Sequence, residues 1–307
     1  MDAKKKKRLN LTKRTMMTIL MIGISVLTIS ISAFAWFLIT NTPKVENIEL
    51  TADTIGTLQI ADNLGNKPGD YSDTLDLKGK IKNSTYLSPV TTKDGLTFFA
   101  PVYTENKVTD LKRETNKTLL DTKYVYEKTF YLRAGEDASQ VDEEKAKIYD
   151  IYLVGSSADS NNGCYVRQKG TDGDGNEITA ANSIRVSLTF EGGNSGDKVT
   201  VIYEPNSDKD NKGIEGKNMA YFAYGGADKT WKEYGAYKTI QQDYDKSFTA
   251  NSNVSSRSTV LDTITEGKDI KVTMRIWLEG MDKDCVNQVA ADEIIGQIQF
   301  GSEERFE

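Results

Sequence analysis

Residues 183–190 read SIRVSLTF, and this stretch indicates the fold class. Every second residue from Ile184 to Phe190 is apolar, while the residues between them, from Arg185 to Thr189, are polar. A period of two places the apolar side chains on one face of a β-strand and the polar side chains on the other. The stretch therefore predicts a strand with one face turned into a core and the other turned outward.

The same alternation returns at residues 269–279 (DIKVTMRIWLE), where the apolar positions run from Ile270 to Leu278. Residues 148–154 (IYDIYLV) are apolar on both parities, which is typical of a central strand. Residues 199–203 (VTVIY) follow a Gly-rich turn and predict a hairpin with the first strand. Further strands are expected at residues 44–51, 57–61, 97–103, 123–133, 164–168 and 294–300.

These segments add up to about ten to twelve short strands, separated by turn-rich loops, and no long amphipathic helix follows residue 40. Strands at this spacing without helical crossovers are typical of an antiparallel sandwich. We therefore predict a mostly β chain, an antiparallel β-sandwich of jelly-roll-like type over residues 40–307. A domain of this length can bury a sizeable core.

The N-terminus differs in composition from the rest of the chain. Residues 1–14 contain seven Lys or Arg and one acid, and residues 15–43 contain no charge. As a helix, residues 15–39 would be about 37 Å long at ~1.5 Å per residue, enough to cross a hydrocarbon layer of ~30 Å. Because the basic residues stay cytoplasmic, residues 40–307 are expected outside the cell. The expected parts are a basic cytoplasmic segment (1–14), a signal or transmembrane helix (15–39) and an extracellular β-sandwich domain (40–307).

Two fates are open for this leader. Ala33-Phe34-Ala35 is a small-x-small cleavage site, and cleavage after Ala35 would give a mature chain that begins at Trp36. The strand at residues 36–48 could then add to the sheet edge of a neighbouring molecule. Without cleavage, the leader would anchor the chain, with Trp36 near the outer interface. The protein is therefore expected either in the cell membrane with an extracellular C-terminal domain or secreted.

Charge and composition exclude several classes of function. The net charge is −6, and because residues 1–14 carry +6, the remainder carries −12. An acidic exported part argues against a nucleic-acid partner, since phosphates require a basic surface. The chain has no histidine, which excludes a His-dependent hydrolase triad and a His-Glu-x-x-His zinc site. A glycan hydrolase that uses two Asp or Glu residues stays open.

The chain contains two cysteines, Cys164 and Cys285. Outside the cell such a pair can form a disulfide, and this bridge would close a loop long enough to stabilise the fold by a few kcal/mol. The alternative is two separate thiols, because spacing alone does not show that the Cα atoms approach within ~7 Å.

Three stretches together carry a family resemblance. They are AFAWF at residues 33–37, SIRVSLT at 183–189 followed by VIYEPN at 201–206, and RIWLEG at 275–280 before MDKDC at 281–285. This combination resembles exported proteins of Gram-positive bacteria related to the camelysin and TasA-like biofilm-fibre group. The resemblance implies a leader processed by a dedicated signal peptidase, a jelly-roll-like β domain, and assembly by strand donation. The metalloprotease label of camelysin-like members is not carried over, because the chain has no histidine.

Two acidic groups are candidate calcium sites. Asp172, Asp174 and Asn176 lie in a TDGDGN segment that resembles the front of a calcium loop, although a hairpin turn explains the same residues. Glu279, Asp282 and Asp284 follow a predicted strand. They could bind Ca²⁺ or act as paired carboxylates, or they could form a solvated acidic turn. No other cofactor is expected.

An aromatic-rich segment follows the predicted hairpin. It has no clear period, so a surface for sugars or proteins and a loop folded over the core are both open. The residues proposed for a contact surface are Tyr221, Tyr224, Trp231, Tyr234 and Tyr237.

Together these features predict an exported, non-enzymatic structural or adhesive protein of the cell surface or extracellular matrix. The membrane, through residues 15–39, and other copies or surface proteins are the expected partners. The alternatives are a surface glycan-binding module and an Asp/Glu-dependent glycan hydrolase.

Overall fold

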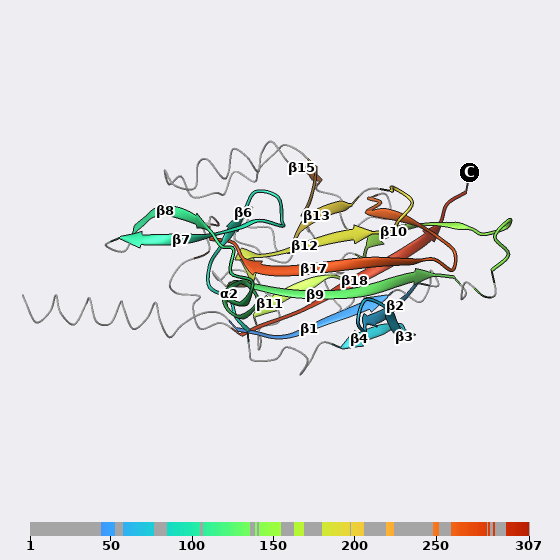
Figure 1. Ribbon diagram of the computed structural model, residues 1–307, viewed down its shortest axis with the longest axis horizontal. Coiled ribbons are helices and arrows are strands. Elements are labelled where there is room, and N and C mark those ends of the chain that lie inside the picture. Colours follow the sequence, from blue (N-terminus) through green and yellow to red (C-terminus); the bar gives the residue numbers. More distant parts are fainter. Residues whose placement is uncertain are drawn as a thin grey trace, which may run out of the picture. The chain divides into compact units, whose positions relative to one another are not determined.

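Most of the residues that the structure describes lie in β-strands (Figure 1). They form two large sheets and a third sheet of three strands. The mostly β fold with antiparallel sheets that the alternation predicts is therefore confirmed. The structure is a computed structural model, and it describes residues 44–52, 58–76, 85–104, 107–135, 139, 141–154, 163–168, 180–196, 198–205, 219–223, 248–251, 259–280, 282, 285 and 293–306.

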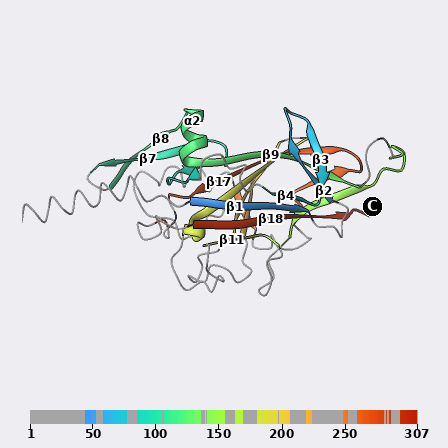
Figure 2. The ribbon, with the colours of Figure 1, turned by 90° about the horizontal axis from the view of Figure 1, so that it is seen from below.

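The first sheet, sheet A, contains both ends of the described chain. Its strands are β1 (Lys44–Ala52), β4 (Thr74–Asp76), β5 (Thr85–Tyr86), β10 (Ile148–Leu153), β11 (Tyr165–Gln168), β16 (Asp262–Thr265) and β18 (Glu293–Glu304). Their order is β16-β10-β18-β1-β4, and β11 and β5 pair with β18 and β1. The pairing of β1 with β18 is parallel, from Lys44 opposite Glu293 to Ala52 opposite Phe300 (Figure 2). The other pairings in sheet A are antiparallel.

The second sheet, sheet B, is antiparallel throughout its described pairings. Its order is β15-β14-β13-β12-β17-β9-β2-β3. The predicted strand at residues 183–190 is β12, and it forms the expected hairpin with β13. The strands are β2 (Leu58–Asn63), β3 (Pro68–Ser72), β9 (Val125–Ala134), β12 (Ile184–Glu191), β13 (Val199–Glu204), β14 (Met219–Ala223), β15 (Phe248–Asn251) and β17 (Asp269–Leu278).

The third sheet and the short helices connect these strands. The third sheet consists of β6 (Thr91–Thr92), β7 (Phe98–Thr104) and β8 (Lys107–Arg113). The β7–β8 hairpin extends beyond the ends of β12 and β17 (Figure 1). The helical turns are α2 (Lys117–Leu119), the π-turn η2 (Leu120–Tyr124) and the 3-10 turn η3 (Ala180–Ser183).

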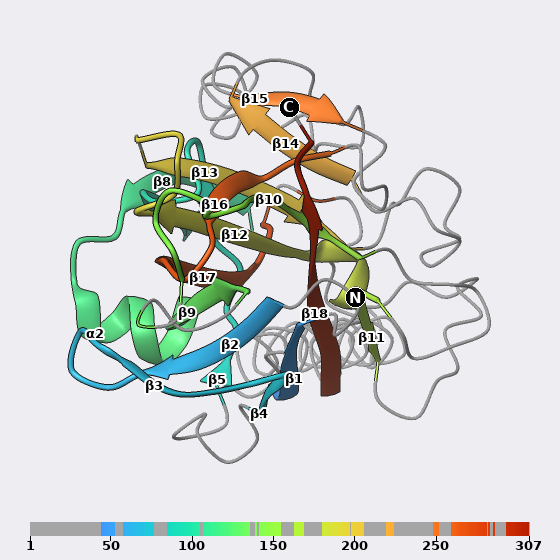
Figure 3. The same cartoon turned by 90° about the vertical axis from the view of Figure 1, so that its right-hand side faces the viewer.

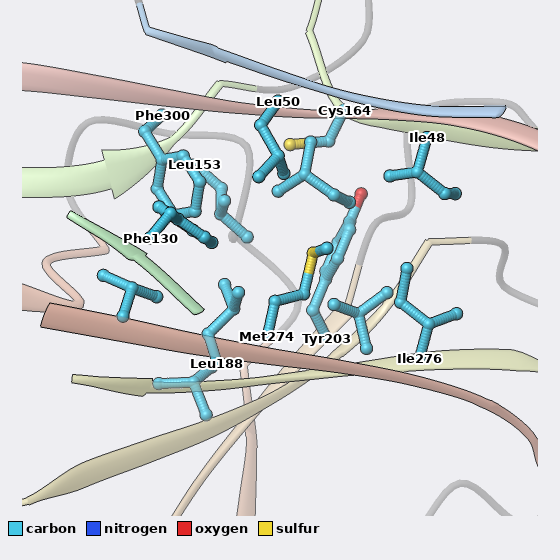
Figure 4. Packing of buried hydrophobic residues seen from close by; sticks show 14 of the residues in the cluster. Ile48, Leu50, Phe130, Leu153, Cys164, Leu188, Tyr203, Met274, Ile276 and Phe300 are labelled. Atoms are coloured by element: carbon cyan, nitrogen blue, oxygen red, sulfur yellow. The ribbon is translucent and has the colours of Figure 1, made fainter. Parts of the chain in front are cut away.

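The two large sheets share one hydrophobic core, in which the residues predicted to point inward are buried. Leu188 of β12 and Met274 of β17 in sheet B, and Leu50 of β1 and Phe300 of β18 in sheet A, belong to the same cluster of buried side chains (Figure 4). Figure 3 shows β12, β17 and β9 on one side and β10, β18 and β1 on the other. This arrangement is consistent with the predicted sandwich.

The outward face of β12 is also covered, which the alternation did not predict. Ser187 is fully buried and its hydroxyl donates to the carbonyl of Gly95, at 3.0 Å. Phe98 of β7 packs edge-on against Trp277 of β17, with ring centroids 5.3 Å apart. The β6–β7 region therefore covers part of the outer face of sheet B. Ser187 and Trp277 point away from the core but are still shielded from solvent.

The predicted leader, residues 15–39, lies outside the described residues, as do Ala33, Ala35 and Trp36. Within the described ranges, no helix is long and apolar enough to cross a membrane.

Candidate functional site

A group of buried charges lies where β12, β13 and the end of β17 meet. We call Arg185, Glu204, Glu279 and Asp282 the Arg185 cluster. Arg185 is 3 % exposed, and the three acids are at most 1 % exposed. The Arg185 Nη2 atom lies 2.7 Å from Glu204 Oε1 and 2.6 Å from Asp282 Oδ2. One guanidinium thus joins a carboxylate of β13 to a carboxylate beyond β17.

The backbone brings these side chains together. Arg185 lies opposite Trp277 in the β12–β17 register, close to the end of β17. Beyond that strand, the Glu279 N–H donates to the Ser183 carbonyl at 2.7 Å, and the Asp282 N–H donates to the Glu279 carbonyl at 3.1 Å. This turn directs the chain back over β12, so that Asp282 meets Arg185.

Further hydrogen bonds surround the charges. The Arg185 Nη1 atom donates to the carbonyls of Asn182 and Ile184, at 2.9 and 3.1 Å. The indole N–H of Trp277 donates to Glu279 Oε2 at 3.0 Å. A buried charge is tolerated only when it is paired and hydrogen-bonded, and these contacts meet that requirement. The cluster therefore fixes the turn after β17 onto sheet B.

This geometry corrects the expected solvated acidic turn at Glu279 and Asp282, because both side chains are buried. Their carboxylates contact Trp277 and Arg185. Within the described part of the chain, no group of three or more His, Cys, Asp or Glu could hold a metal ion. Calcium binding or acid–base chemistry at these two residues therefore receives no support from their contacts.

Several predicted site residues lie outside the described ranges. Tyr221 is in β14, where its backbone pairs with Ile202 and Ala250. The remaining predicted site residues lie outside the described ranges: Asp172, Asp174, Asn176, Asp284, Tyr224, Trp231, Tyr234 and Tyr237.

Cys164 and Cys285 are both thiols in the structure, which corresponds to the alternative without a bridge. Cys164 is 1 % exposed, and the Gln299 N–H donates to its sulfur at 3.2 Å. Burial raises the pKa of the Cys164 thiol to about 12. Burial, together with the neighbouring Cys164, also raises the pKa of Tyr203 well above its ordinary value. Cys164 is thus a core residue and not a reactive thiol.

Sequence reasoning did not find Arg185 or Glu204. Both are charged residues on strands. For Arg185, the alternation along β12 predicts an exposed position.

Comparison with known proteins gives no relative. No family model, no curated protein and no solved structure matches the chain.

Replacement of Arg185 is expected to be costly. Arg185→Met keeps the side-chain volume but leaves Glu204 and Asp282 buried without their cation, which should lower the free energy of unfolding by about 3–5 kcal/mol. Urea unfolding at pH 7, followed by tryptophan fluorescence, measures this loss. Arg275→Met is the matched control: it removes the partly exposed 2.8 Å pair with Glu127 and should cost about 1 kcal/mol or less. Equal losses in both variants would contradict the assigned role of the cluster.

The two cysteines should differ in reactivity. The thiolate is the nucleophile, and the raised pKa and burial of Cys164 should make its alkylation by iodoacetamide at pH 8 at least about a hundredfold slower than that of Cys285. Mass spectrometry of the peptides measures both rates, and both residues should react at similar rates in urea. Resistance of both residues until a reductant is added would instead show a disulfide.

Proposed function

We propose that this chain is an exported, non-enzymatic protein of a Gram-positive cell surface or extracellular matrix, with a structural or adhesive role. The basic-then-apolar leader and the acidic remainder support export. The resemblance of residues 33–37, 183–189 and 275–280 to the camelysin and TasA-like group supports a matrix role. We also propose that the strands are connected as in a jelly roll, as the resemblance implies.

The observation that carries this proposal is the position of β1 in sheet A. A tether at residues 15–39 would enter the fold at Lys44, where β1 begins. This strand is not an edge: β18 lies on one side, and β4 and β5 lie on the other. Any force on the tether is therefore delivered directly to a central strand.

The direction of pairing decides how such a force acts. Hydrogen bonds between strands are perpendicular or slanted to the strand axis. In a parallel pair, the start of β1 at Lys44 and the end of β18 at Glu304 lie at opposite ends. When the chain is pulled at Lys44 and held at Glu304, all the hydrogen bonds between β1 and β18 are therefore loaded together in shear. Bonds that must break together resist more force than bonds that break one after another. This geometry suits a protein that transmits load between a membrane and a matrix.

The position of β1 also limits strand exchange between copies. Residues 44–48, part of the segment proposed for donation, already pair within their own sheet. Donation of the whole segment 36–48 would require these pairs to open, so we restrict the proposal to residues 36–43, which lie outside the described residues. Self-association is proposed in this restricted form.

The fate of the leader tests the export proposal. N-terminal sequencing of the protein from native cells and from culture medium should give either a chain that begins at Trp36 in the medium or matrix, or an intact N-terminus in the membrane fraction. The first outcome identifies a released subunit and the second an anchored protein. Recovery of the intact chain only from the cytoplasm would contradict the proposed function.

The mechanical proposal predicts a dependence on pulling direction. With handles at the two ends of the full chain, single-molecule pulling should give one high-force rupture, because β1 and β18 are loaded in shear. Moving the second handle to a position directly before Glu293 places both handles at the same end of the parallel pair. The bonds then break successively, and the rupture force should fall severalfold. Equal forces in the two geometries would contradict a load-bearing role for this pair.

A further inference from the structure

A hollow of about 530 Å³ lies at the edge of sheet A, at the end of β12 opposite to the Arg185 cluster. Its wall combines the edge strand β16, the turn between β12 and β13, and Arg305 near the C-terminus. The volume is within the range of roughly 300–1,000 Å³ that is usual for small-molecule sites. None of the expected site residues lines it.

The wall is held in a fixed conformation by the docked turn. The Asn194 N–H donates to the Thr263 carbonyl at 2.8 Å, and the Thr265 hydroxyl donates to the Asn194 side-chain carbonyl at 3.0 Å. Gly193 lies so close to Asp262 that a Cβ atom there would be 2.2 Å from the carboxylate. A side chain at this position would displace the Asp262 carboxylate, so the turn and the acid pack directly against each other.

Asp262 supplies a preorganised acceptor. Its side chain is buried, its Oδ1 accepts from the Thr263 N–H at 2.7 Å, and its Oδ2 accepts from the Ser195 hydroxyl at 3.2 Å. Each carboxylate oxygen can accept more than one hydrogen bond. The carboxylate is thus oriented by the protein and keeps capacity for a ligand hydroxyl.

The remaining wall offers donors and an apolar area similar in size to the polar area. The Arg305 Nε atom lies 2.9 Å from Asp150 Oδ1, and this pair does not use the Nη atoms of the guanidinium. The Asn194 amide nitrogen is likewise not used in the bond with Thr265. Ile148 and Leu261 contribute aliphatic surface.

This combination selects one ligand chemistry. The wall contains the carboxylate of Asp262, and its one guanidinium, of Arg305, is already paired with Asp150, so an anionic ligand would meet no net positive charge. The polar groups of the wall disfavour a ligand without hydrogen-bonding groups, because such a ligand would cover them without pairing them. A hydroxyl both donates and accepts, so several hydroxyls on a ring can satisfy an acid, an amide and a guanidinium while the C–H face packs on the aliphatic side chains. We propose that this hollow, which we call the β16 pocket, binds one neutral sugar residue of a glycan.

The β16 pocket is independent of the proposed load-bearing role. A shallow site open to water on one side should bind a monosaccharide with a Kd of about 1–10 mM. Such affinity becomes effective when many copies meet a repetitive glycan, because linked sites raise the effective concentration.

Saturation-transfer difference NMR on the full chain tests the proposal. The protein is kept in a detergent without a sugar headgroup, and the probes are glucose, galactose, mannose and N-acetylglucosamine, with glucuronate as the anionic comparison. We expect saturable binding of at least one neutral sugar in the millimolar range, and weaker binding of glucuronate. No saturable binding of any neutral sugar, or a preference for glucuronate, would overturn the proposal.

A pair of matched variants locates the site. Thr263→Trp places a large side chain in the β16 pocket on an edge strand, where an aromatic residue is well tolerated, and should weaken sugar binding at least tenfold. Thr109→Trp makes the same change at an exposed position of β8 and should leave binding unchanged. Circular dichroism and thermal unfolding show whether each variant is folded, and the rim variant Asn194→Ala gives a second measurement if Thr263→Trp is not. Unchanged binding in a folded pocket variant, or equal loss in Thr109→Trp, would overturn the assignment.

Discussion

Strand β18 is hydrogen-bonded on both sides, in parallel to β1 and antiparallel to β10 and β11. The last described strand therefore completes the middle of sheet A and supplies Ile294, Ile298 and Phe300 to the core. Since the partners β1 and β18 are separated by almost the whole chain, sheet A cannot close before the C-terminus is available. Contacts of such large sequence separation slow folding. Under the proposed export, this order would delay folding until the chain has been translocated.

The two ends of β12 have different surroundings. Near its start, the Arg185 cluster is covered by the turn beyond β17, and one guanidinium contacts the carboxylates of Glu204 and Asp282 in a dry environment. Beyond its other end, the β12–β13 turn protects the edge strand β16, and its polar groups line a hollow. A covered acid beside a guanidinium fixes the fold, whereas an oriented acid that lines a hollow has the geometry that the proposed ligand recognition requires.

The sequence predicts those parts of the fold that depend on local pattern. The alternation at Ile184–Glu191 and Asp269–Leu278 identifies β12 and β17, and the apolar segment at Ile148–Leu153 identifies the central strand β10. Polar strands are missed: β3 (Pro68–Ser72) lies in a stretch that its Gly, Asp and Asn content assigns to a loop. Such a strand forms because β2 offers it a partner, and that partner does not appear in a local window.

The Arg185 cluster was not predictable for a related reason. Local alternation separates the two faces of a strand, but it does not say whether a further layer covers the outer face. Here the β6–β7 region covers Ser187 and Trp277 on that outer face, and the turn beyond β17 brings Asp282 onto Arg185. The pairing of β1 with β18 is likewise a property of the whole chain. It joins two unremarkable strand patterns, yet the proposed load-bearing role depends on it. The mechanical and the recognition roles proposed for this protein therefore both depend on long-range placement of residues with ordinary local sequence.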